Sequence, residues 1–151
     1  MNTITLTFKI DIQATQQTVF EYVSDWERQS GWIPFTTVKN LSESVKGQGA
    51  SLLAVTGFGP LKFSDTMVVT TWQPYDTIVV EHTGRIVLGK GVFSVHPHAD
   101  DSCTFVWQEI TPVPFGLIGQ AGLFLIKPLM NSMFDRALKK LKSNIELNNY
   151  S

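Results

Sequence analysis

The feature that most constrains the fold is a change of period in the hydrophobic pattern along the chain. Residues 4–12 alternate between apolar and polar side chains, as a strand with one buried face does. Beyond Pro128 the apolar residues recur at spacings of three and four, and charged residues lie between them. This pattern predicts one long helix from Met130 to Leu147, which Pro128 bends or separates from an earlier helical turn.

Between these two regions the sequence predicts two short helices and six further strands. Thr15 can cap a first helix, and a second short helix runs from Trp26 towards Trp32, where Pro34 ends it. Turns rich in glycine, proline and aspartate separate the strands. The predicted strands are Phe35–Val45, Ala50–Thr56, Lys62–Trp72, Thr77–Thr83, Gly91–Val95 and Thr104–Thr111.

This order of elements predicts an α+β fold. A curved, seven-stranded antiparallel sheet would wrap around the long C-terminal helix, with the two short helices after the first strand. One helix cannot cover the concave face of seven strands, so we expect a cavity between them. A chain of 151 residues can bury its own core, and we find no repeat or linker. We therefore expect a single domain over residues 1–151.

Charge and cysteine content narrow the possible partners. Lys and Arg number 12 and Asp and Glu 13, giving a formal charge of −1 without a basic stripe, so we expect no nucleic-acid partner. The single Cys103 cannot form an internal disulfide, which suits a reducing compartment. No basic segment leads into an apolar run at the start of the chain. Together these features predict a cytoplasmic protein.

Two polar residues, Asp65 and His82, fall on the strand faces that the pattern directs into the cavity. A four-residue loop over residues 72–75 would give three cross-strand pairs, namely Val69 with Ile78, Met67 with Val80, and Asp65 with His82. A carboxylate beside an imidazole in an apolar cavity can raise the histidine pKa and make the ring a general acid and base. The alternative is a polar rim or ion pair at the open end of the hairpin.

The other candidate binding residues are apolar. Methionine and aromatic side chains suit an adaptable pocket, although the same residue types also fill ordinary cores. On the last strand, the pattern leaves open whether Trp107 and Glu109 or Val106 and Gln108 face inward. The predicted lining comprises Trp32, Met67, Val69, Ile78, Val80, Phe93, Val95, Met130, Met133 and Phe134.

Neither a metal nor a cofactor is expected. His96 and His98 share a strand face near Asp100 and Asp101, but Pro97 and the acidic turn are typical of an exposed strand end. The segment Val113–Met130 is nearly all apolar. Polar interruptions and glycines make it a poor membrane span, whereas docking on a membrane surface beside the pocket mouth would suit it.

Several short motifs carry a family resemblance across essentially the whole chain. They are Ile12-Gln13-Ala14 before Val19-Phe20 and Asp25, Trp32 on the following turn, Val69 before Pro74, and the closing run of residues 137–142. With the element order, they resemble the START-like, or SRPBCC, helix-grip superfamily. Thr15 stands where that family often has proline. Its members include lipid-transfer domains and polyketide cyclase/dehydrase relatives without a shared catalytic motif, so the resemblance implies a pocket rather than a reaction.

Three functions remain open from the sequence. The first is binding or transport of a small hydrophobic ligand, such as a lipid or a polyketide-like compound. The second is a cyclase/dehydrase-type enzyme in which Asp65 and His82 transfer protons. The third is a domain that interacts with a protein or a membrane through residues 113–130.

Overall fold

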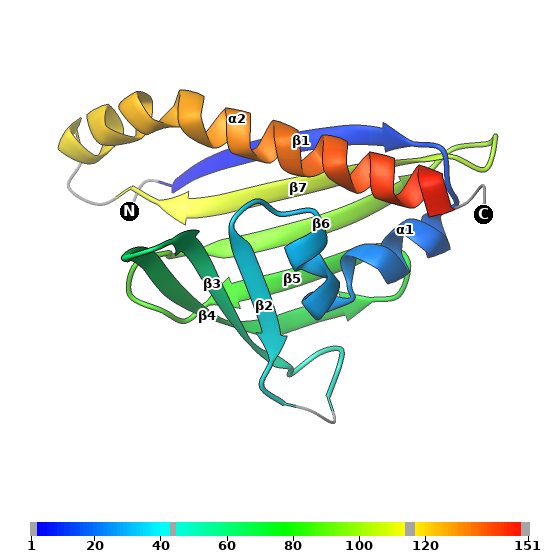
Figure 1. Ribbon diagram of the computed structural model, residues 1–151, viewed down its shortest axis with the longest axis horizontal. Helices are drawn as coiled ribbons and strands as arrows, with labels where there is room; N and C mark the ends of the chain where they lie inside the picture. The colour runs from blue at the N-terminus through cyan, green and yellow to red at the C-terminus, as the bar shows by residue number, and fades with distance from the viewer. Residues whose placement is uncertain (1–2, 43–44, 114–116, 149–151) are drawn as a thin grey trace.

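The chain forms one sheet with a long helix across it (Figure 1). The computed structural model describes residues 3–42, 45–113 and 117–148. The elements are β1 (Thr3–Ile12), α1 (Gln16–Val23), the 3-10 helix η1 (Trp26–Gly31), β2 (Thr36–Asn40), β3 (Ser51–Phe58), β4 (Leu61–Gln73), β5 (Thr77–His82), β6 (Lys90–Pro97), β7 (Cys103–Pro112) and α2 (Leu117–Asn148).

The seven strands form one sheet in the order β1-β7-β6-β5-β4-β3-β2, with every neighbouring pair antiparallel. The first strand lies beside the last, while β2 to β7 follow one another as a meander. The helices α1 and η1 connect the two edge strands (Figure 1). The predicted α+β fold, with a seven-stranded antiparallel sheet and a long C-terminal helix, is confirmed.

The C-terminal half of α2 is the part that the sheet grips. Its buried stripe consists of Ala137, Leu138, Leu141 and Ile145, which belong to the main hydrophobic core. At the same end, the Lys142 ammonium donates to a backbone carbonyl of β1 at 2.8 Å. These contacts fix one end of the helix and leave its first turns to project beyond the sheet (Figure 1).

Pro128 lies inside α2 and does not divide it. The helix begins at Leu117, which is earlier than the sequence pattern predicted. A proline removes one backbone hydrogen bond, and here the neighbouring side chains Lys127 and Leu129 are exposed, so water can reach the helix surface where the bond is lost. Residues 114–116 of the predicted membrane-docking segment lie outside the described residues.

The predicted register of the β4–β5 hairpin is wrong by two residues. The connection has three residues, Pro74 to Asp76, rather than four, and it is closed by a hydrogen bond from the Asp76 amide to the Gln73 carbonyl at 3.0 Å. A bulge then adds Thr70 to β4. The resulting pairs are Val69 with Val80 and Met67 with His82, in place of Val69 with Ile78 and Met67 with Val80.

Strand β2 is shorter than predicted and ends at Asn40. Its side chain accepts from the Ser42 amide at 2.9 Å and donates to the Val45 carbonyl at 2.7 Å. These bonds satisfy backbone groups that a longer strand would have paired, so the chain turns here. Residues 43–44 of the predicted strand lie outside the described residues.

Candidate functional site

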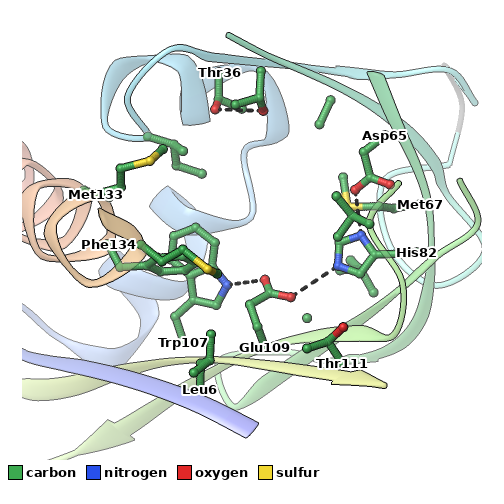
Figure 2. A pocket seen from close by; sticks show the side chains of 18 of the residues that line it. Leu6, Thr36, Asp65, Met67, His82, Trp107, Glu109, Thr111, Met133 and Phe134 are labelled. Carbon is green, nitrogen blue, oxygen red and sulfur yellow. Dashed lines mark hydrogen bonds and ion pairs between the residues drawn. The ribbon is translucent and has the colours of Figure 1, made fainter. Parts of the chain in front are cut away.

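A cavity of about 810 Å³ lies between the concave face of the sheet, η1 and α2. Its volume falls within the range of about 300–1,000 Å³ that is typical of small-molecule sites. Figure 2 shows side chains entering it from α2, from the sheet and from the region of β2. The predicted lining residues that face the cavity are Met67, Ile78, Val80, Phe93, Met130, Met133 and Phe134.

Three predicted lining residues, Trp32, Val69 and Val95, lie in the core instead. The Trp32 indole is 2% exposed and packs edge-on against Phe105 and Trp107, with ring centroids 6.2 and 5.7 Å away. Val69 and Val95 are each 1% exposed. The sequence pattern places Val69 and Val95 on the concave face and Trp32 on the turn after the second short helix, but it cannot say where the packed core ends and the cavity begins.

Other lining residues were not predicted. Ile4 and Leu6 lie on the partly buried alternating face of β1, and both line the cavity. Others come from strands β3 and β4 and from the loops around the opening, and in the loops no period exists to place them. The unpredicted apolar lining includes Ile33, Leu52, Phe63, Ile86 and Leu88.

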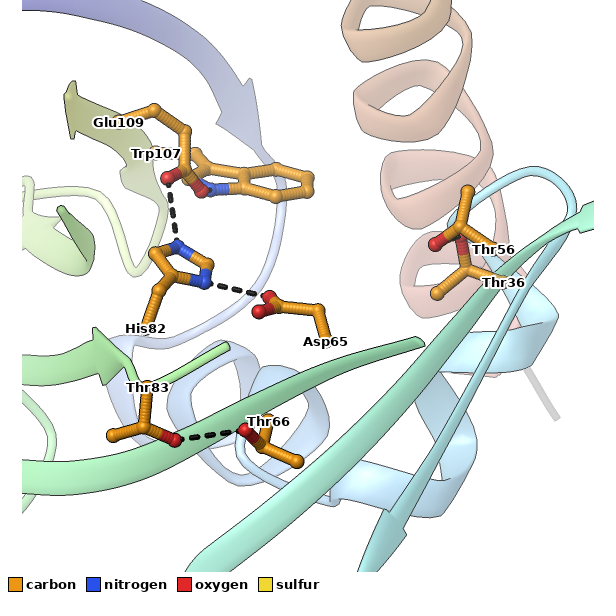
Figure 3. A network of polar contacts seen from close by, with 8 residues as sticks. All are labelled: Thr36, Thr56, Asp65, Thr66, His82, Thr83, Trp107 and Glu109. Carbon is orange, nitrogen blue, oxygen red and sulfur yellow. Dashed lines mark hydrogen bonds and ion pairs between the residues drawn. The ribbon is translucent and has the colours of Figure 1, made fainter. Parts of the chain in front are cut away.

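The polar end of the cavity is a cluster of three ionisable side chains, Asp65, His82 and Glu109 (Figure 3). His82 Nδ1 lies 2.6 Å from Asp65 Oδ2, and His82 Nε2 lies 3.3 Å from Glu109 Oε2. The other Glu109 oxygen, Oε1, accepts from Trp107 Nε1 at 2.8 Å. The inward pair on β7 is thus Trp107 and Glu109, which the sequence had left open.

The fold brings these residues together from three different strands. Asp65 lies on β4, two residues before Met67, which is the cross-strand partner of His82. Its carboxylate therefore reaches the imidazole diagonally across the hairpin. Next to this pair, the Thr83 hydroxyl donates to the Thr66 hydroxyl at 2.9 Å (Figure 3). This bond continues the contact between the strands just past the end of β5.

Glu109 reaches His82 across the intervening strand β6 because Gly91 lies between them. Gly91 is opposite Val80 on one side and Glu109 on the other. A Cβ at this position would lie 3.1 Å from Val80 Cγ2 and 3.2 Å from Glu109 Oε1. The absence of a side chain leaves room for the carboxylate to bend over β6 towards the imidazole.

The two carboxylates control the charge of the buried imidazole. Burial alone would lower the pKa of His82, but the hydrogen bonds that the ring donates to Asp65 and Glu109, with the attraction of both carboxylates, raise it to about 9. At neutral pH the ring is therefore an imidazolium that donates from both nitrogens. The side chains of His82 and Asp65 are only 6% and 8% exposed, so water screens this attraction little.

Comparison with known proteins places the chain in a family. The sequence matches the model of a family described as polyketide cyclase / dehydrase and lipid transport, over residues 3–146. The chain belongs to this family. A comparison with curated proteins found no significant match. The family match confirms the resemblance seen in the sequence.

Several solved structures have the same fold as this chain. A START superfamily protein from Mycobacterium smegmatis is 16% identical with a TM-score of 0.75, over 95% of this chain and 97% of that one. The di-domain ARO/CYC protein BexL from the BE-7585A biosynthetic pathway is also 16% identical with a TM-score of 0.75. The match covers 98% of this chain but only 48% of BexL. The Aha1 dimer from Colwellia psychrerythraea is 13% identical with a TM-score of 0.67, over 95% and 96% of the two chains.

Of the three charged side chains in the cluster, Glu109 is the one most accessible to a ligand in the cavity. Both nitrogens of His82 are already hydrogen bonded, so the ring has no free lone pair with which to accept a proton. The Glu109 side chain is 19% exposed and lines the cavity. The sequence did not predict Glu109 as a site residue, because the pattern left open which face of β7 points inward. The more apolar face, which holds Phe105 and Trp107, could have indicated that Glu109 points inward as well.

The described residues contain neither a metal-binding cluster nor a membrane-spanning helix. In residues 3–42, 45–113 and 117–148, no group of three or more His, Cys, Asp or Glu side chains is arranged to hold a metal ion. His98 instead hydrogen bonds the Thr104 hydroxyl at 2.7 Å. In the same part of the chain, no helix is long and apolar enough to cross a membrane.

Proposed function

We propose that this chain binds a small, mostly apolar molecule, such as a lipid or a polyketide-like compound, inside the cavity. The observation that carries this proposal is the cavity of about 810 Å³, which has an apolar lining and one polar cluster at Asp65, His82 and Glu109. An apolar body would be held by the lining, and a single polar group would be oriented by the cluster. The family match, which includes lipid transport in its description, is consistent with this function.

Filling the cavity should abolish binding of an apolar probe. Val80 projects from β5 into the cavity, so Val80→Trp would place an indole in the space that a ligand needs. We expect the affinity for the neutral fluorophore N-phenyl-1-naphthylamine to fall by at least about tenfold. Fluorescence titration of wild type and variant measures this change directly.

The matched control is Val79→Trp on the opposite face of β5. Val79 precedes Val80 and does not line the cavity, so its indole would leave the cavity open. We expect this variant to bind the probe as wild type does. If a folded Val80→Trp variant keeps wild-type affinity, the probe does not bind in this cavity and the proposed function fails.

A second candidate function is a cyclase/dehydrase-type reaction that requires proton transfer. The contact between Asp65 and His82 at 2.6 Å, beside the cavity-facing Glu109, favours it. In this candidate Glu109 accepts a proton from one substrate atom and returns it to another, while the His82 imidazolium, held by Asp65, stabilises the Glu109 carboxylate. The description of BexL as an ARO/CYC protein of a biosynthetic pathway is consistent with this chemistry.

The mouth of the cavity favours contact with an anionic membrane surface. We define the mouth rim as the segments 57–63, 84–90 and 117–130, which lie at one end of the molecule (Figure 1). Their sequences contain four basic residues and no Asp or Glu, although the whole chain has a net charge of −1. Exposed apolar side chains accompany these charges, among them Leu61, Ile86, Phe124, Leu125 and Leu129. Such a surface can insert apolar side chains between lipids while its cations meet anionic headgroups.

Reversing two charges of the mouth rim should weaken binding to anionic vesicles. Each basic residue near such a surface contributes about 1 kcal/mol, so the double variant Arg85→Glu/Lys127→Glu should lose at least about tenfold in affinity. Sedimentation with phosphatidylglycerol vesicles measures this loss. The control Lys139→Glu/Lys140→Glu makes the same charge change at the other end of α2 and should bind as wild type does. Equal loss in both variants, or equal binding to phosphatidylcholine vesicles, would argue against a specific mouth-first contact.

A further inference from the structure

The polar cluster at the end of the cavity carries excess negative charge. Its two carboxylates, Asp65 and Glu109, each face one nitrogen of a single imidazole. The ring can donate to both only as an imidazolium, because in a neutral ring one nitrogen lone pair would face a carboxylate oxygen. Even in that protonated form the three side chains together carry a charge of −1.

No basic side chain compensates this charge in the described residues. Among residues 3–42, 45–113 and 117–148, the ion-pair partner of both Asp65 and Glu109 is His82, and no Lys or Arg lies within 4.0 Å of either carboxylate. Lys127 does line the cavity, but it belongs to the exposed mouth rim. An uncompensated buried charge is costly, so the cluster favours an incoming positive charge.

The cluster also offers acceptors rather than donors. The indole of Trp107 and both imidazole nitrogens already donate to the two carboxylates. A carboxylate has about four lone-pair sites, so Glu109 can accept further hydrogen bonds on its cavity side. In the part of the chain that the structure describes, Asp65 Oδ1 is buried without any hydrogen-bond partner. A ligand carboxylate would meet like charge and no free donor here, whereas a ligand ammonium would meet acceptors and opposite charge.

Aromatic rings beside Glu109 suit a cation as well. Trp107 and Phe134 line the same side of the cavity (Figure 2), with ring centroids 4.4 Å apart. The Trp107 ring also packs against Phe93, with ring centroids 5.3 Å apart. The faces of such rings attract cations, and the attraction increases where water is excluded. The apolar remainder of the cavity leaves space for a hydrocarbon body behind the cationic group.

We propose that the cavity selects amphiphilic amines, whose protonated amino group binds against Glu109 while the apolar body occupies the rest of the cavity. This inference rests on the proposed binding function and specifies its ligand class. Neutral alcohols can also donate to Glu109, but they do not neutralise the charge of the cluster, so they rank between amines and carboxylic acids.

Three ligands of equal chain length test the preference at neutral pH. Decylamine, decanol and decanoic acid would each displace N-phenyl-1-naphthylamine from the wild-type protein in a fluorescence titration. We expect decylamine to displace the probe at a concentration at least about tenfold lower than decanoic acid, with decanol between them. Equal displacement by all three, or a preference for decanoic acid, would overturn the inference and leave the binding function standing. A probe that does not bind at all would instead remove the proposed function on which the inference rests.

Charge-neutralising variants locate the preference. At about pH 5, where the His82 ring stays protonated in both variants, Glu109→Gln brings the cluster to zero charge while keeping a side chain of similar shape, and Asp65→Asn does the same from the other side of His82. We expect each folded variant to lose most of the preference for decylamine over decanol. Glu81 is the exposed neighbour of His82, and its side chain does not line the cavity. The control Glu81→Gln therefore removes one carboxylate outside the cavity and should keep the preference for decylamine. If Glu109→Gln and Asp65→Asn both fold and both retain the full preference, the ammonium does not bind at this cluster and the inference is wrong.

Discussion

We expect the His82 imidazole to titrate with a pKa of about 9, compared with its ordinary value of 6.5. Burial opposes this increase, and the hydrogen bonds with Asp65 and Glu109 outweigh it. Following the ring carbon protons by NMR as the pH is raised gives the value directly. Asp65→Asn and Glu109→Gln should each lower it by about 1–3 units, the usual effect of removing an opposite charge in contact.

Glu81→Gln is the control for this titration. Its side chain lies next to His82 on the exposed face of β5, so it should leave the His82 pKa close to the wild-type value. A His82 pKa below 6.5 would mean that burial dominates and that the ring is neutral at physiological pH. In that case the imidazolium assigned to the cluster, and its hydrogen bonds to both carboxylates, would be wrong.

The stability of the protein should fall as the pH rises from about 6 to about 9, because the folded state binds the His82 proton more tightly than the unfolded state. The contribution is fully present below the unfolded pKa of about 6.5 and is lost as the pH rises through about 9. A pKa difference of this size corresponds to roughly 3 kcal/mol of the free energy of unfolding. Urea unfolding at several pH values measures it.

The His82→Gln variant separates this effect from other titrations. It should lose most of the pH dependence over this range and be less stable than wild type near pH 6. Burial also raises the pKa of the Cys103 thiol to about 11, so its own contribution is lost mainly above the range used here. Parallel stability curves for wild type and His82→Gln would show that the two carboxylates do not hold the imidazole in its charged form.

The fold could be predicted because the spacing of apolar residues along the sequence follows the geometry of the strand or helix that they form. Alternation in residues 4–12 and the spacing from Met130 to Leu147 each reappear as one element with one buried face. The glycine, proline and aspartate residues between the apolar segments indicated the turns, because these residue types favour turn conformations of the backbone. The sequence therefore predicted the sheet, its antiparallel connections and the covering helix before any contact was known.

The site could be predicted only in part, because it depends on register and on side chains that reach between strands. A bulge at Thr70 and a shorter loop shifted the β4–β5 pairing, so the contact between Asp65 and His82 is diagonal rather than directly cross-strand. Glu109 joins them across β6 because Gly91 has no side chain. Neither the bulge nor this crossing leaves a periodic signal in the sequence.

Intermolecular NOEs between N-phenyl-1-naphthylamine and the methionine methyl groups test the central claim most directly, since they locate the bound molecule. The chain has 4 methionines, and Met67, Met130 and Met133 line the cavity. Binding inside the cavity predicts NOEs from the probe to these three methyl groups and to Val80. NOEs confined to exposed apolar side chains outside the lining, such as Leu125 and Leu147, would contradict the account, because the probe would then bind the surface and leave the cavity empty.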